Sequence, residues 1–227
     1  MDYAAARANM IECQVRTNKV IDPDVIAAMA TVPREAFVPE ALRPVAYIDE
    51  DLTVAPGRFL LEPMIIARLL QSAEVKKTDR ALDFATGTGY GAALLAQLAG
   101  TVTALDSRAS LLDLARRALA AAPVPVTLVE APLDGVLAQA DGLVGQSFDV
   151  ILICGALPKV PAALLDLLAD GGRLVTILKP EVAGGGEPPM GSATLFVKRG
   201  GVAAGRTLFD SATPLLPEFA PKPQFVF

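Results

Sequence analysis

The sequence predicts an α/β protein built on one mostly parallel sheet, with a helical region before it and an antiparallel hairpin after it. Three observations support this prediction. Strand-like and helix-like segments alternate with short turns from Arg80 onward, a pattern typical of βαβ units. A glycine-rich turn, residues 83–89, joins the first of these strands to a helix. Residues 1–72 instead contain helix-like segments interrupted by prolines.

The N-terminal region is predicted to contain three helices, which span residues 3–15, 23–31 and 61–71. Asp22 followed by Pro23 is typical of a helix start, with a capping carboxylate and a proline at the first helical position. Glu62 before Pro63 repeats that pattern. Prolines between residues 33 and 56 predict irregular connections. We expect residues 1–72 to form a substrate-side helical region packed on a core of residues 73–227, the whole being a single domain.

The core alternates strands and helices, so its crossovers should be right-handed and helices should cover both sheet faces. Two further strands predict the closing hairpin, and the glycine- and proline-rich residues 184–191 predict a loop before it. The proline-rich tail is expected to run extended along the surface. The predicted strands are 81–84, 101–105, 124–129, 148–153, 173–178, 192–199 and 206–210, the helices are 90–98, 110–121 and 161–168, and the tail is 213–227.

Composition excludes several classes of function. The net charge is −5 and Lys and Arg form no block, which argues against a nucleic-acid partner. No apolar run is long enough to span a bilayer and the N-terminus lacks a signal-peptide pattern, so we expect a cytoplasmic protein with no membrane partner. Histidine is absent and the only cysteines are Cys13 and Cys154, so imidazole-dependent hydrolysis is excluded and no metal site is expected.

The glycine-rich turn carries the main functional signal. Glycines let a backbone turn tightly beside a ligand, and the helix that follows offers unpaired N–H groups. Asp106 ends the next predicted strand, where an acidic side chain can accept both hydroxyls of a ribose. This arrangement is shared by NAD-dependent enzymes and by proteins that bind S-adenosylmethionine.

Two features favour S-adenosylmethionine. Asp83 lies in the strand just before the glycines, where negative charge is unfavourable for a pyrophosphate but suits a positively charged methionine group. The spacing of Asp83, Gly87 and Gly89 also fits the acid-x-G-x-G-x-G register, with Ala85 in place of the first glycine. A methyl group is tolerated there if φ is negative; otherwise the loop should shift or cofactor affinity should fall. The candidate cofactor-binding residues are Asp83, Ala85, Thr86, Gly87, Thr88, Gly89, Asp106, Ser107, Glu130 and Ala131.

Several motifs resemble those of protein-L-isoaspartate O-methyltransferases. The most specific is Val-Pro-Arg-Glu-Ala-Phe-Val-Pro at residues 32–39; others are residues 10–16, 46–47, 86–90, 148–149 and 171–175. The resemblance implies a Rossmann-like S-adenosylmethionine-dependent methyltransferase sheet, protein repair as the role, and methyl transfer to a carboxylate. A carboxylate is ionised at neutral pH and is its own nucleophile, so alignment and exclusion of water suffice without a histidine base.

The substrate motif departs from that family, whose glycine is followed by Thr-x-Ser. Here Phe59 and Leu61 replace the two hydroxyl residues, so the substrate pocket should be more apolar. Arg58 is the candidate clamp for a substrate carboxylate, because a guanidinium binds a carboxylate with two parallel hydrogen bonds; the alternative is a solvated loop arginine. Arg58 and Leu61 are therefore the candidate catalytic-site residues.

The sequence leaves four functions open. The first is methylation of isoaspartyl or related protein carboxylates, and the second is methylation of another substrate, such as a small-molecule carboxylate, by the same fold. The third is a regulatory protein that binds S-adenosylmethionine without catalysis, and the fourth is a NAD-dependent oxidoreductase. Neither the oligomeric state nor the physiological substrate follows from the sequence.

Overall fold

The computed structural model describes residues 1–134, 142–180 and 190–220. Most of the loop predicted at residues 184–191 lies outside these ranges. No helix within them is long and apolar enough to cross a membrane.

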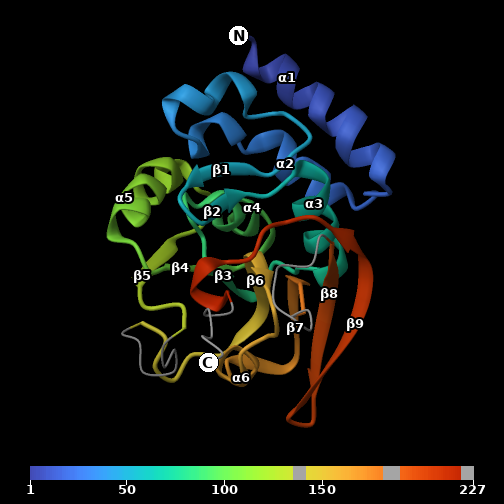
Figure 1. Cartoon of the computed structure of the whole chain (residues 1–227), viewed down its shortest axis with the longest axis vertical. Coiled ribbons are helices and arrows are strands. Elements are labelled where there is room, and N and C mark those ends of the chain that lie inside the picture. The colour runs from blue at the N-terminus through green and yellow to red at the C-terminus, as the bar shows by residue number, and fades with distance from the viewer. Residues whose placement is uncertain (135–141, 181–189, 221–227) are drawn as a thin grey trace, which may run out of the picture.

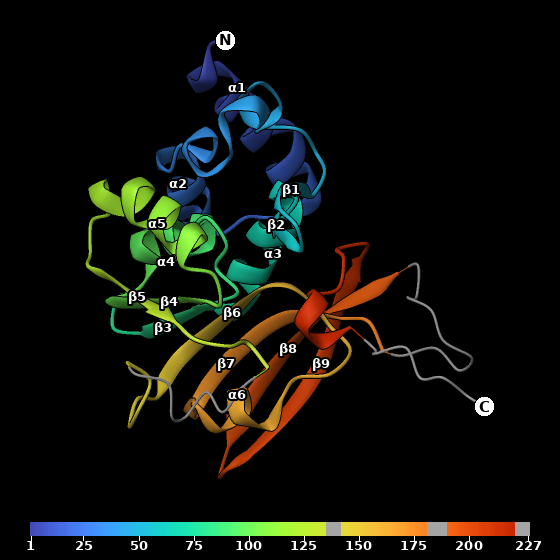
Figure 2. The same ribbon diagram turned by 60° about the vertical axis from the view of Figure 1, so that its left-hand side comes forward.

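A seven-stranded sheet forms the centre of the molecule, with strand order β5-β4-β3-β6-β7-β8-β9. The first five strands in this order are parallel, and β8 and β9 continue the sheet as an antiparallel hairpin. Figure 2 shows the strands side by side along a strongly twisted sheet. The strands are β3 (Arg80–Phe84), β4 (Thr101–Asp106), β5 (Val126–Glu130), β6 (Phe148–Leu157), β7 (Leu168–Leu178), β8 (Gly191–Arg199) and β9 (Val202–Ser211).

Helices cover both faces of the sheet, as Figure 2 shows. The helices α3 (Pro63–Ala73), α4 (Tyr90–Leu98) and α5 (Ala109–Ala118) lie on one face, while the short α6 (Ala162–Asp166) packs against β7 on the other. Each face has its own buried apolar cluster. The central strand β6 is buried along nearly its whole length, which explains its continuous apolar run.

The N-terminal region lies over the carboxyl ends of the parallel strands (Figure 1). A two-stranded antiparallel hairpin, β1 and β2, leads from this region into α3. The elements are α1 (Tyr3–Met10), the π-helical turn η1 (Ile11–Val15), α2 (Pro23–Thr31), β1 (Leu52–Ala55), β2 (Arg58–Leu60) and the 3-10 turns η2 (Arg16–Asn18), η3 (Arg34–Phe37) and η4 (Glu40–Val45).

Three sequence predictions need correction. The stretch predicted to be irregular contains η3, η4 and β1. The helix predicted at 161–168 is only Ala162–Asp166, because β7 begins at Leu168. The tail is not simply a surface segment: Leu216 is fully buried, and residues 217–219 form the 3-10 turn η7 (Pro217–Phe219).

Candidate active site

The glycine-rich turn connects β3 to α4 with three left-handed residues. Gly87 and Gly89 have φ values of +57° and +94°, and Ala85 has a φ of +58°. The condition of a negative φ for Ala85 is therefore not met, yet the loop keeps its tight turn. A left-handed conformation costs a residue with a Cβ roughly 1–2 kcal/mol. This strain is held in place by the buried surroundings of Ala85.

Asp83 fixes the loop to the start of α4. Its Oδ2 accepts a hydrogen bond from Thr86 Oγ1 at 2.6 Å, and its Oδ1 accepts one from Cys154 Sγ at 3.0 Å. A Cβ on Gly91 would lie 2.8 Å from Asp83 Oδ2, so only glycine allows the helix to approach this closely. Burial raises the pKa of Asp83 to about 6, although these hydrogen bonds lower it. Asp83 therefore connects the glycine-rich loop, through Thr86, to the neighbouring strand β6, through Cys154.

Asp106 ends β4 and is fully buried. Two backbone N–H groups donate to it: Gly87 N to Oδ2 at 3.0 Å, and Arg108 N to Oδ1 at 3.2 Å. The carboxylate is thus fixed beside the glycine-rich loop at the carboxyl end of a parallel strand. This is the position at which sheets of this type bind ligands.

Arg58 forms a two-pronged ion pair with Asp106. Its Nε donates to Asp106 Oδ2 at 2.8 Å and its Nη2 donates to Asp106 Oδ1 at 3.1 Å. The side chains of both residues are 0% exposed. The predicted carboxylate clamp therefore binds a carboxylate of its own chain.

The same guanidinium also pairs with Glu218 of η7. Arg58 Nη2 donates to Glu218 Oε1 at 2.7 Å, and Nη1 donates to Oε2 at 3.1 Å. With further bonds to Ser107 Oγ and Gly57 O, every side-chain N–H of Arg58 has an acceptor. Burial lowers the pKa of Arg58, but the hydrogen bonds to Glu218 and Asp106 outweigh burial and raise it. Burial raises the pKa of Glu218, but the hydrogen bonds and the charge of Arg58 outweigh burial, so that this pKa is lowered overall.

Residues 213–220, which we call the strap, bring Glu218 to this position. Leu216 N donates to Ala156 O at 2.9 Å, and Ala156 N donates to Pro214 O at 3.0 Å. Pro217 packs against Gly57, where a Cβ would lie 2.3 Å from Pro217 Cγ. The ring of Phe219 lies 6.2 Å from that of Phe84. Figure 1 shows the strap in red, crossing near β3 and β6.

A cavity of about 430 Å³ lies beside Ser107, the residue that follows Asp106 in the chain. Its lining includes Ser107, Glu130, Ala131 and Glu218. Glu130 is paired in register with Asp106 at the ends of β5 and β4. The structure thus brings together the ribose-side and adenine-side residues predicted from the sequence, and it adds Glu218.

The substrate motif is packed rather than open. Leu61 is 1% exposed, and its carbonyl oxygen accepts a hydrogen bond from Arg34 Nη2 at 2.7 Å. Arg34 also donates from Nε to Ala46 O at 2.7 Å and lies 5.1 Å from the centre of the Tyr90 ring. Burial lowers the pKa of Arg34. Arg34 lies in the Val-Pro-Arg motif and so connects that motif to the backbone of the substrate motif at Leu61.

Glu62 occupies the predicted cap position of α3, but its side chain makes no capping hydrogen bond. Instead, the backbone N–H of Glu62 donates to Asp51 Oδ1 at 2.6 Å. Burial, together with the nearby charges of Asp49 and Asp51, raises the pKa of Glu62 to about 7.

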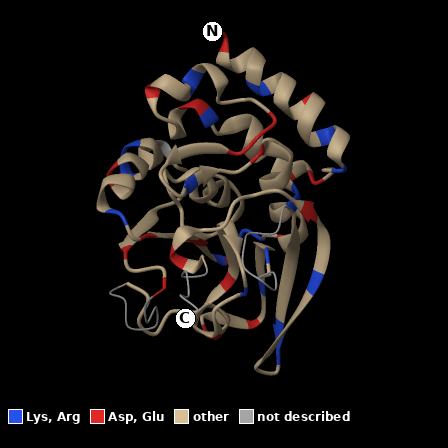
Figure 3. Ribbon diagram, in the orientation of Figure 1, with Lys and Arg blue, Asp and Glu red and all other residues tan. Residues whose placement is uncertain are grey.

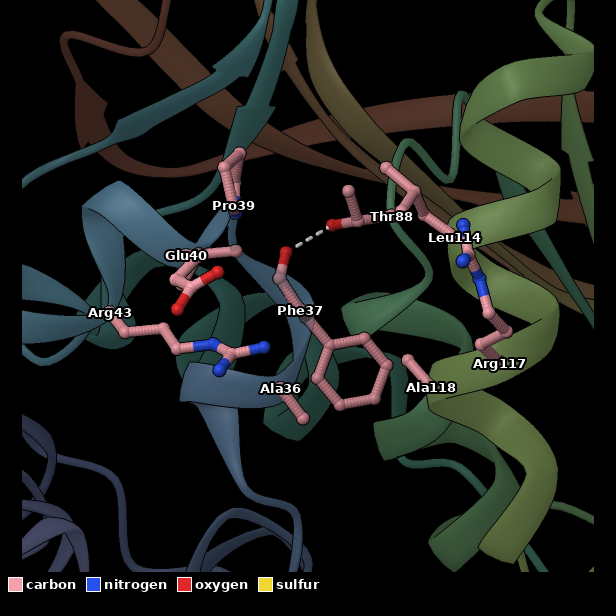
Figure 4. Close-up of a pocket in the computed structure, with 10 residues that line it drawn as sticks. Ala36, Phe37, Pro39, Glu40, Arg43, Thr88, Leu114, Arg117 and Ala118 are labelled. Carbon is pink, nitrogen blue, oxygen red and sulfur yellow. Dashed lines mark hydrogen bonds between the residues drawn. The ribbon is translucent and has the colours of Figure 1, made fainter.

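A second cavity, of about 490 Å³, lies between η3, η4, the glycine-rich loop and α5. Figure 4 shows Arg43 and Arg117 on opposite sides of it, with Phe37 between them. Thr88 Oγ1 donates to Phe37 O at 2.5 Å, the dashed line in that view. Thr88 therefore joins the glycine-rich loop to the N-terminal region. Both arginines are exposed. Figure 3, in the orientation of Figure 1, shows Lys and Arg scattered among acidic residues over the whole molecule.

Comparison with known proteins identifies the family. Residues 6–183 match the family model described as protein-L-isoaspartate(D-aspartate) O-methyltransferase. A protein-L-isoaspartate O-methyltransferase of Koribacter versatilis is 41% identical over 175 residues, which are 76% of each chain. The chain belongs to the protein-L-isoaspartate O-methyltransferase family. Another relative of that name, from Methanoculleus marisnigri, is 38% identical over 178 residues, or 77% of each chain.

The fold agrees with this family. A solved Plasmodium falciparum structure, described as a protein-L-isoaspartate O-methyltransferase with S-adenosyl-L-homocysteine, has a TM-score of 0.75 and 20% identity, covering 96% of this chain and 99% of its own. Another structure of that enzyme name has a TM-score of 0.74 and 18% identity, covering 94% and 67%. The predicted family, the fold and the class of S-adenosylmethionine-dependent O-methyltransferase are confirmed.

The residues present suit this cofactor in kind. Asp106 offers two oxygens for ribose hydroxyls, and the cavity beside Ser107 offers space for a base. However, Arg58 holds both oxygens of Asp106, and Glu218 lines the base-side cavity. In this structure the two oxygens that would accept the ribose hydroxyls are therefore bound by Arg58.

Proposed function

We propose that this member of the protein-L-isoaspartate O-methyltransferase family methylates a carboxylate of a protein substrate, with isoaspartyl residues as the first substrate to test. The observation that supports it is Asp106, which backbone N–H groups fix at the carboxyl end of β4 beside the glycine-rich loop. S-adenosylmethionine supplies an electrophilic methyl group on a sulfonium. Asp106 would hold the ribose, and Ser107, Glu130 and Ala131 would line the base site.

The chain's own residues contribute orientation and exclusion of water. Asp83 and Thr86 hold the glycine-rich loop in place. Leu61 gives the substrate motif an apolar, buried centre. A substrate carboxylate needs no general base, because it is already ionised at neutral pH. The expected rate gain comes from alignment of two reactants in a dry site.

Two measurements test this proposal. Calorimetry with S-adenosylhomocysteine should show binding to the wild-type protein, and Asp106→Ala should weaken it by about 1–3 kcal/mol through lost hydrogen bonds. An isoaspartyl peptide with labelled S-adenosylmethionine should gain a base-labile methyl ester, whereas the matched aspartyl peptide should not. Cofactor binding without label transfer to the isoaspartyl peptide would contradict the isoaspartyl assignment.

The second candidate is a regulatory protein that binds S-adenosylmethionine without catalysis. It is favoured by the substrate motif, where Phe59 and Leu61 supply no hydroxyl group and Leu61 is buried. Cofactor binding with no methyl transfer to isoaspartyl peptides or to small-molecule carboxylates would support this candidate.

A further inference from the structure

Arg58 and Glu218 meet at the cofactor side of the site although they are far apart in the sequence. Arg58 begins β2 in the N-terminal region, whereas Glu218 lies in η7 near the end of the described chain. Between Asp106 and Glu218, one guanidinium joins two carboxylates through four hydrogen bonds of 2.7–3.1 Å. We call these three residues the latch.

We propose that the latch closes the nucleoside site, so that S-adenosylmethionine binds only when Arg58 and Glu218 leave Asp106. This inference rests on the proposed function, since it concerns how that cofactor reaches its site. The binding-competent form is then a minor state of the ligand-free protein, and the apparent dissociation constant is the intrinsic one divided by the open fraction.

Competition for Asp106 is the first argument. Oδ1 and Oδ2 each accept one hydrogen bond from a backbone N–H and one from Arg58. The backbone bonds belong to the loop geometry and remain. A ribose diol can therefore reach both oxygens only in place of the guanidinium, because both groups need the same two acceptors.

The packing of the strap is the second argument. The position of Glu218 is fixed by the packing of its neighbours, because Leu216 and Pro217 each pack closely against a glycine. A Cβ at Gly155 would lie 2.6 Å from Leu216 Cδ2, and one at Gly57 would lie 2.3 Å from Pro217 Cγ. These contacts hold Glu218 beside Arg58, and Glu218 is one of the residues that line the base-side cavity.

The charges of the latch residues distinguish this proposal from a direct charge effect on the ligand. The latch contains two carboxylates and one guanidinium, so Glu218→Gln and Arg58→Gln change the local charge in opposite directions. If these residues acted only through their charges on the ligand, the two substitutions would have opposite effects on affinity. If the latch closes the site, both substitutions should instead increase the affinity.

The test is the affinity for S-adenosylhomocysteine, measured by calorimetry without any turnover. Glu218→Gln and Arg58→Gln should each tighten binding by about tenfold or more, because a charge-assisted bond that holds the closed state is lost. The double variant should bind no more tightly than Arg58→Gln alone, since a site opened by one change cannot be opened again. Glu12→Gln and Arg16→Gln are the matched controls, because Glu12 and Arg16 form an exposed ion pair at 3.0 Å; they should leave affinity unchanged.

Each alternative result has a separate meaning. Equal affinity in the wild type and both latch variants overturns the latch and leaves the proposed function standing. Weaker binding in either variant also overturns it, because that residue then contacts the ligand directly. Absence of binding in the wild type and in every variant overturns both the latch and the proposed function. Thermal melting of each variant confirms that it is folded before affinities are compared.

Discussion

The side chain of Leu216 packs directly on the backbone of Gly155. A Cβ at Gly155 would lie 2.6 Å from Cδ2 and from Cγ of Leu216, and Leu216 is 0% exposed. The central strand β6 thus carries a glycine where the strap crosses it. The contact joins the carboxyl end of the sheet to residues more than fifty positions later in the chain.

Leu216→Ala should destabilise the protein by about 2–4 kcal/mol, because a large apolar side chain is removed from a filled site. Urea unfolding measures this loss as a lower midpoint. Val202→Ala is the control, since Val202 is 70% exposed and should cost little. A loss below about 1 kcal/mol for Leu216→Ala would mean that the strap opens before the core unfolds.

Gly155→Ala should also destabilise the protein, because the new methyl group overlaps Leu216. The cost should largely disappear in the Leu216→Ala background, where the overlapping atoms are absent. A double-mutant cycle on unfolding free energies measures this coupling. Additive losses would show that Gly155 is required for its backbone conformation rather than for the contact.

Ala85→Gly should stabilise the protein by about 0.5–1 kcal/mol. Glycine removes the cost of a left-handed φ, which exceeds the extra chain entropy that glycine loses on folding. Ala93→Gly in α4 is the matched control and should cost about 1 kcal/mol, since Ala93 lies inside a helix. The two substitutions should therefore shift the melting temperature in opposite directions; a shift in the same direction contradicts the strain at Ala85.

Glu62→Gln should change the pH dependence of stability. The folded pKa of about 7 exceeds the ordinary value of 4.5, so the folded protein binds more protons than the unfolded chain between these values. Stability contributed by protonated Glu62 is therefore present below pH 4.5 and lost as pH rises through 7. The wild type should lose stability between pH 5 and pH 8, whereas Glu62→Gln has no carboxyl group to titrate. The unfolding free energy of Glu62→Gln minus that of the wild type should therefore rise by about 1 kcal/mol from pH 5 to pH 8, after allowing for partial exposure. Urea unfolding of the two proteins at pH 5 and at pH 8 measures this change. The same free-energy difference between the two proteins at pH 5 and at pH 8 would contradict the raised pKa.

Elements set by local signals could be predicted closely from the sequence. The helix Pro23–Thr31 was predicted with its observed bounds, because Asp22 caps it: its Oδ1 accepts hydrogen bonds from the N–H groups of Asp24 and Val25. The helix Tyr90–Leu98 was equally clear, since it follows directly from the glycine-rich turn. The position of Asp106 follows from β4, which is parallel to β3.

Elements set by distant contacts could not be predicted. The strand β1 alternates buried and less buried residues, Leu52 and Val54 being buried, but a pattern of four residues is too short to predict a strand, and β1 forms through pairs such as Leu52 with Leu60. Glu218 lies in a short proline-flanked stretch without periodicity, and its partner Arg58 is 160 positions away. The side chain of Glu62 makes no capping hydrogen bond although its position before Pro63 is that of a cap, and its own backbone N–H is bound by Asp51, which lies eleven residues earlier.

The two thiols of the chain offer a reporter that needs no engineering. Cys13 is exposed, whereas Cys154 is buried with its S–H donated to Asp83. Burial and the charge of Asp83 raise the pKa of Cys154 well above its usual range, so an alkylating reagent should modify Cys13 at once and Cys154 only after the loop over Asp83 has opened. The rate of the slow phase of alkylation, followed by mass spectrometry, then measures how often the structure around the glycine-rich turn opens.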